Sequence, residues 1–152
     1  MTSMSIRSMA RRASTVRAAA KGAPSYSETL PCTEESAGAA RVLARVVLAT
    51  WGLGCLTDDA ELIVSELVTN ALRYARPHPI RVAISRPVPD VVEIRVSDRN
   101  PCALPVVAAA PDAEHGRGLA VVDALAVRRT IDYRKWGKSI TVTLAVFAGA
   151  GA

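Results

Sequence analysis

Glu66 and Asn70 are the residues of this chain whose types and spacing best suit catalysis. They lie four residues apart in a segment with helical periodicity, so their side chains should be neighbours on one face of a helix. A carboxylate can take a proton from an attacking hydroxyl group, and an amide oxygen can bind a hard cation such as Mg²⁺. A solvated Glu and Asn on a surface helix is the commoner explanation of such a pair alone, so the hypothesis needs further residues.

Two other segments could supply them. Asp98 follows an alternating strand pattern and opens Asp98-Arg99-Asn100-Pro101, where an acceptor at a strand end can bind an amino group. An Asp there is also commonly a turn residue that caps its own backbone. Gly116-Arg117-Gly118-Leu119 leads into an apolar helical segment. Without side chains, glycines let backbone N–H groups approach a phosphate near a helix N-terminus, although alone they more often mark a turn.

Two helices are predicted ahead of Asp98. The first starts from Thr33 as N-cap and runs to about Trp51. The second starts at Thr57, with acidic residues in its first turn that favour the helix dipole, and Pro77 ends it. Its apolar residues share one broad arc, which predicts a packed helix that carries Glu66 and Asn70 at the border of that arc: Leu62, Ile63, Val64, Leu67, Val68, Ala71 and Leu72.

Strands and a long loop account for the rest of the folded part. Alternating patterns predict strands, of which the second and third are joined by Pro87-Val88-Pro89-Asp90 and should pair antiparallel. From Asp98 to Gly118 the periodicity disappears, which predicts a long loop, followed by a short helix at about Leu119 to Ala126. Loops of this length are usually functional lids or disordered linkers. The strands are predicted at Tyr26–Leu30, Ile80–Ile84, Val92–Val96, Val127–Tyr133 and Ser139–Phe147. An antiparallel sheet with helices on one face follows.

In order and spacing, the three motifs together resemble the N-box, the strand-end aspartate of the G1 box and the G2 box of histidine-kinase-like (GHKL, Bergerat-fold) ATPases. The resemblance covers nearly the whole chain after residue 24. It implies an α+β two-layer sandwich with a mixed, mainly antiparallel sheet and helices on one face. Asp-x-x-Pro followed by Glu-His-Gly-Arg-Gly-Leu resembles most the anti-sigma-factor serine kinases and their actinobacterial relatives.

By this resemblance, ATP and Mg²⁺ are the expected cofactors. Glu66 would be the general base and Asn70 the Mg²⁺ ligand. The other nucleotide-binding residues would contact the adenine or hold the phosphates beneath a lid: Asp98, Asn100, Pro101, Gly116, Arg117, Gly118 and Leu119. Two features depart from the family pattern, since Tyr74 stands where relatives often have His and the lid is rich in Ala and Val.

Two functions from different classes follow. In the first, the protein is a serine/threonine kinase that phosphorylates a STAS-type anti-anti-sigma protein and sequesters a sigma factor. In the second, it is a non-catalytic, nucleotide-gated module that binds a partner. The presence of Glu66 favours the kinase. Related proteins are commonly dimers, so a homodimer is compatible with either function.

Composition narrows the functions further. At 152 residues and with half of them hydrophobic, the chain fits one globular domain, expected at 25–148. Residues 1–24 hold five of the 19 basic residues and no acidic one, which leaves 14 basic against 14 acidic residues. This basic stretch is expected to be a disordered tail or an over-extended gene start, and a neutral body argues against direct nucleic-acid binding. No apolar stretch is long enough to span a membrane, and three separated cysteines suggest a reducing compartment, so we expect a cytoplasmic protein.

Other motifs fail on their context. Gly137-Lys138-Ser139 resembles the end of a P-loop, but Asp132 stands where the earlier glycine is required and a strand follows instead of a helix. Gly116-x-Gly118 has Val121 where a dinucleotide fingerprint needs a small residue. His78 and His115 have no spaced partner for metal or triad chemistry, so both are interpreted as loop residues.

Overall fold

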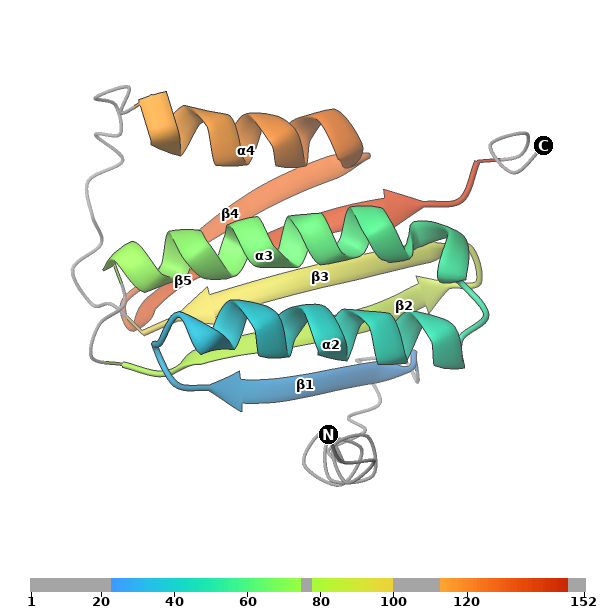
Figure 1. The fold of residues 1–152 in the computed structure, drawn as a ribbon, viewed down its shortest axis with the longest axis horizontal. Coiled ribbons are helices and arrows are strands. Elements are labelled where there is room, and N and C mark those ends of the chain that lie inside the picture. The colour runs from blue at the N-terminus through green and yellow to red at the C-terminus, as the bar shows by residue number, and fades with distance from the viewer. Residues whose placement is uncertain (1–22, 75–77, 100–112, 148–152) are drawn as a thin grey trace.

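The computed structural model describes residues 23–74, 78–99 and 113–147. Five strands form one sheet in the order β1-β2-β3-β5-β4, and every neighbouring pair among them is antiparallel. The α-helices lie side by side over one face of this sheet (Figure 1). The predicted α+β sandwich with helices on one face is therefore confirmed. The elements are β1 (Ser25–Leu30), α2 (Glu35–Thr50), the short 3-10 helix η1 (Gly54–Leu56), α3 (Thr57–Tyr74), β2 (Ile80–Val88), β3 (Val91–Asp98), α4 (Ala113–Leu125), β4 (Arg128–Arg134) and β5 (Gly137–Ala145).

The core lies between the sheet and the helices. Val82, Val96 and Ile140 face each other across β2, β3 and β5, and all three are buried. Because side chains alternate along a strand, their neighbours in sequence point to the opposite, helix-free face. That face carries small polar residues, among them Ser97 and Ser139, whose hydroxyl groups lie 2.7 Å apart in a hydrogen bond.

Helix α2 packs against α3 and β2, but it begins differently from the prediction. Its N-cap is Glu34, without a capping side-chain hydrogen bond, so the assignment of Thr33 as N-cap is wrong. Ser36 forms two hydrogen bonds at this end of the helix. Its hydroxyl group donates to the Pro31 carbonyl, and its N–H donates to the Thr33 carbonyl. Hydrogen bonds from the backbone N–H of Glu35 and from the Thr33 side chain lower the pKa of Glu35.

The end of α2 is anchored by an aromatic pair. Trp51 follows the helix, and its ring lies 5.8 Å from that of Tyr26 in β1, centroid to centroid, at a tilt of 48°. Tyr26 pairs with Ile84, whereas Leu30 at the other end of β1 pairs with Ile80. This aromatic contact therefore marks the end of the sandwich opposite to the one where β3 finishes.

The connection between β2 and β3 is shorter than expected. β2 continues to Val88 through a register shift between Ser85 and Val88, so that only Pro89 and Asp90 form the turn. Pro87 lies within this irregular part, where the missing N–H of proline interrupts the ladder least. Among the residues that the structure describes, no helix is both long and apolar enough to cross a membrane.

Candidate functional site

The segments singled out by the sequence meet at one end of the sandwich. Figure 1 shows the C-terminal part of α3, the end of β3, the start of β5 and the first turns of α4 at the same edge. The register explains this arrangement, because Asp98 at the end of β3 pairs with Ile80 on one side and with Lys138 on the other. Ile80 follows α3 after a short connection, which brings the end of that helix close to Asp98.

Glu66 and Asn70 lie on the flank of α3 that is turned away from α2. At about 100° per residue, with Leu67 buried beneath the helix, Glu61 and Ser65 project to one side of the buried stripe and Glu66 and Asn70 to the other. Glu66 and Asn70 are both half-buried. The predicted pairing of these two side chains at the border of the apolar arc is therefore compatible with the structure, and their chemical roles stay predictions.

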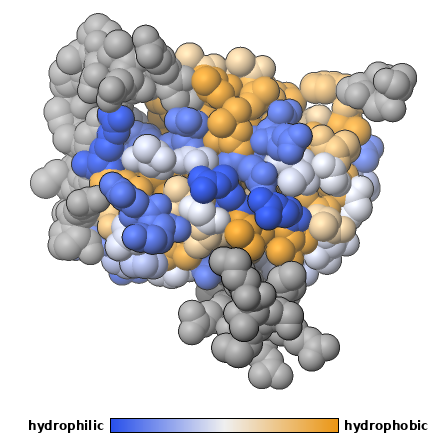
Figure 2. Space-filling view, in the orientation of Figure 1, coloured by the Kyte–Doolittle hydropathy of each residue, from blue (hydrophilic) through white to orange (hydrophobic). Residues whose placement is uncertain are grey.

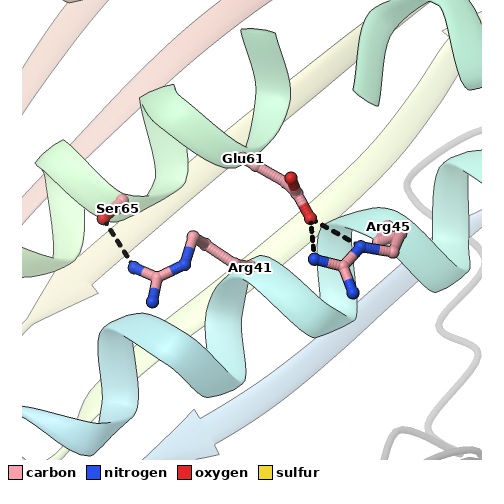
Figure 3. A network of polar contacts seen from close by, with 4 residues as sticks. All are labelled: Arg41, Arg45, Glu61 and Ser65. Carbon is pink, nitrogen blue, oxygen red and sulfur yellow. Dashed lines mark hydrogen bonds and ion pairs between the residues drawn. The ribbon is translucent and has the colours of Figure 1, made fainter. Parts of the chain in front are cut away.

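The other flank of α3 is already occupied by α2. Arg41 donates to the Ser65 hydroxyl group at 2.9 Å, and Arg45 approaches Glu61 with two nitrogens at 2.6 and 2.7 Å (Figure 3). These contacts use the polar side chains of that flank to hold the two helices together. Glu66 and Asn70 instead face the side on which α4 packs against α3.

Asp98 is a buried carboxylate at the end of β3. Only 3% of its surface is exposed, and its place in the register puts it in the same helix-facing row as Val96. The Lys138 ammonium lies 3.9 Å from its Oδ2 atom. Burial lowers the pKa of Lys138, while the negative charge of Asp98 acts in the opposite direction. A charged pair at the edge of an apolar core is costly to bury and marks a candidate for function.

Lys138 is the residue that sequence reasoning missed. Its motif, Gly137-Lys138-Ser139, resembles only the end of a P-loop, which the surrounding sequence excludes. The signal that could have found it is the alternation along β5, since Ile140, Val142 and Leu144 are buried and Lys138 continues the same row. A lysine at the first position of an otherwise apolar row is the anomaly to look for.

Gly137 lets β5 approach the end of β3. A Cβ atom at this position would lie 1.9 Å from the Asp98 carbonyl oxygen, and its φ of +153° disfavours other residues. Only glycine fits both conditions without a shift of the backbone. The preceding Trp136, in the β4–β5 turn, is 47% exposed. The turn is therefore held against the strand end that carries Asp98.

The glycine motif lies inside α4, which corrects the expected loop. The helix begins at Ala113 instead of about Leu119, so Gly116, Arg117 and Gly118 belong to its first two turns. Only the first four N–H groups of a helix lack a partner within it. Phosphate binding by Gly118 and Leu119 would therefore require this end of the helix to unwind, and the assignment stays a prediction. Leu119 is half-buried.

Two further site residues cannot be placed. Asn100 and Pro101 lie outside the described residues, as does most of the expected loop. Within the described part, no three His, Cys, Asp or Glu side chains cluster as a metal site. Mg²⁺ usually keeps several waters and is bound through one or two protein oxygens together with substrate phosphates. The half-buried Asn70 amide fits that limited role, and the buried Asp98 carboxylate fits an acceptor for an amino group.

Comparison with protein families gives a match that spans these elements. The model described as "Histidine kinase-like ATPase domain" matches residues 30–144, from the end of β1 to the end of β5. A search of curated proteins found no match.

Proposed function

Because the chain belongs to the histidine kinase-like ATPase family, we propose that it is an ATP-binding regulator that phosphorylates a serine or threonine of a STAS-type anti-anti-sigma protein. In the same proposal it sequesters a sigma factor when that antagonist is phosphorylated. The observation that carries the proposal is the meeting of three elements at one end of the sandwich: the flank of α3 that carries Glu66 and Asn70, the end of β3 and the start of α4.

Asp98 binds the adenine ring in this proposal. Its carboxylate accepts a hydrogen bond from the 6-amino group of adenine, and its burial strengthens that bond because little water competes. The backbone around it is fixed on both sides by the pairs with Ile80 and Lys138. A rigid acceptor of this kind costs little reorganisation when the nucleotide binds.

Asn70 and Glu66 act at the phosphate end. The Asn70 amide oxygen binds Mg²⁺, and Glu66, one helical turn before it, takes the proton of the attacking hydroxyl group. Bound Mg²⁺-ATP supplies the phosphoryl group. Phosphoryl transfer requires mostly positioning and charge neutralisation, which one base and one amide on a packed helix can provide.

The choice of partner rests on the motifs of the sequence. Asp98-Arg99-Asn100-Pro101 and Glu114-His115-Gly116-Arg117-Gly118-Leu119 support the anti-sigma-factor kinase class. The balanced charge of residues 25–152 supports a protein partner rather than nucleic acid. The second candidate, a nucleotide-gated binding module without catalysis, differs from the first only in the task of Glu66.

A transfer assay separates the two candidates. The chain is incubated with labelled ATP, Mg²⁺ and the STAS-type proteins of its own genome, and phosphate on the STAS protein is measured. Glu66→Gln should lower the transfer rate about 10²- to 10⁴-fold, the usual contribution of a general base, without loss of ATP affinity.

Glu61→Gln is the matched control, because Glu61 lies on the opposite flank of α3 and binds Arg45. It should keep the transfer rate. If the wild-type chain binds ATP but transfers no phosphate, the kinase is excluded and the binding module remains. If the wild-type chain does not bind ATP at all, both candidates are wrong.

A further inference from the structure

The geometry around Asp98 points to Lys138 as a second residue that recognises the adenine. Asp98 accepts a hydrogen bond from the 6-amino group, and Lys138 donates one to the ring nitrogen N1 beside it. This inference rests on the proposed function, since it needs a nucleotide base at Asp98. It adds a residue from β5 to a site otherwise built from α3, β3 and α4.

Lys138 lies beside Asp98 on the helix-covered face of the sheet. It pairs with Asp98 across β3 and β5, so both side chains leave the sheet on the helix-covered face. The ammonium nitrogen lies 3.9 Å from Asp98 Oδ2, and 19% of the lysine side chain is exposed. Gly137, whose absent side chain allows the close approach to the Asp98 carbonyl, holds the start of β5 in this position.

The ammonium group of Lys138 costs free energy to remove from water at this position. Its row on β5 continues with the buried Ile140 and Val142, where an apolar residue would pack without desolvating a charge. At 3.9 Å the ion pair with Asp98 is longer than a hydrogen bond of about 2.7–3.2 Å. The pair is therefore no tight structural bridge, and replacing such pairs by apolar residues is often neutral or stabilising. A hydrogen bond from this ammonium group to a bound ligand would offset part of that cost.

The hydrogen-bonding edge of adenine matches the pair of side chains Asp98 and Lys138. The edge of adenine that carries the 6-amino group presents a donor and, beside it, the N1 acceptor. Asp98 and Lys138 present an acceptor and a donor side by side, which matches that edge. Guanine has the reverse order, with an acceptor oxygen and then an N–H donor, so its oxygen would meet the carboxylate. An ammonium group has three donors, so Lys138 can contact Asp98 and N1 together.

The test compares nucleotides that differ by one atom. Calorimetry measures the affinity of the wild-type chain for Mg²⁺-ATP and for 1-deaza-ATP, in which a C–H group replaces N1. A hydrogen bond from a charged group predicts that the wild-type chain binds 1-deaza-ATP about ten-fold or more weakly. Lys138→Met should bind ATP about ten-fold more weakly, and it should no longer distinguish the two nucleotides.

Lys135→Met is the matched control, because Lys135 is an exposed lysine in the turn that leads to β5. It removes the same charge from the same hairpin and should keep both affinities. Lys138→Arg, which keeps a cationic donor, should retain part of the preference for ATP over 1-deaza-ATP. A lysine that only supports the fold would change both affinities together.

Three outcomes would overturn the inference. The first is a wild-type chain that binds 1-deaza-ATP as tightly as ATP, a result that needs no variant to fold. The second is Lys138→Met with equal losses for the two nucleotides. In both, ATP still binds and the proposed function stands. The third is a wild-type chain that binds no adenine nucleotide, which overturns the proposed function as well.

Discussion

The two flanks of α3 differ in how firmly they are closed. On one flank, α2 buries Leu43, Val47 and Leu48 and is joined to α3 by two arginines. On the other, Val122 is the one fully buried side chain among the described side chains of α4, and Val121 is exposed. Figure 2 shows hydrophobic residues gathered over the described part of α4, whereas hydrophilic residues run across α3.

This difference indicates that the helices on the two flanks have different structural roles. A helix with a broad buried face and polar cross-links forms a platform that keeps Glu66 and Asn70 in place. A helix seated by few apolar contacts opens at lower free energy than the rest of the domain. Among the described side chains, α4 contributes less to the core than α2 does, and the proposed nucleotide site lies on the flank of α3 that α4 covers.

The largest expected effect comes from damage to the closed flank. Leu48→Ala removes a fully buried side chain from α2 and should lower the free energy of unfolding by about 2–5 kcal/mol. Chemical denaturation followed by circular dichroism measures this value. A loss below about 1 kcal/mol would mean that α2 is no more firmly seated than α4, and the comparison would fail.

A smaller effect is expected on the open flank. Val122→Ala removes two methyl groups from the main anchor of α4 and should cost about 1–2 kcal/mol. The loss should appear as faster hydrogen exchange in α4, with exchange in α3 unchanged, and as weaker ATP binding. Equal acceleration in both helices would show that α4 opens only with the whole domain.

The smallest effect is expected from the polar cross-link itself. Arg45→Met removes the ion pair with Glu61, in which the arginine side chain is 60% exposed, and should cost about 0.2–1 kcal/mol. ATP affinity should not change, because Glu66 and Asn70 lie on the other flank. A changed affinity, measured by calorimetry, would show that the α2 contact controls the site through α3.

The parts of the fold that were predicted correctly depend on local patterns. The apolar arc and the acidic first turn placed α3 at Thr57, and alternation placed β2 and β3. The start of α4 was wrong because the two glycines at 116 and 118 outweighed the signal of Asp112-Ala113-Glu114, an N-cap type residue followed by an acidic first turn.

The sequence motifs predicted only those residues of the candidate site that the motifs themselves contain. Glu66, Asn70 and Asp98 were singled out, and the structure brings their elements to one edge. Lys138 was missed because its position beside Asp98 follows from the pairing of β3 with β5, two strands separated by a helix and a third strand. Register between distant strands depends on long-range contacts, which no local pattern contains.

The two tryptophans of the chain lie at opposite ends of the sandwich. Trp51 packs against Tyr26 in a tilted arrangement at one end, and the half-exposed Trp136 lies at the other, next to the glycine that approaches the Asp98 carbonyl. A Trp51→Phe chain therefore carries a single indole, in the turn that precedes Gly137 and Lys138. Its fluorescence spectrum serves as a built-in optical probe of occupancy at that edge, with no added label and no signal from the far end.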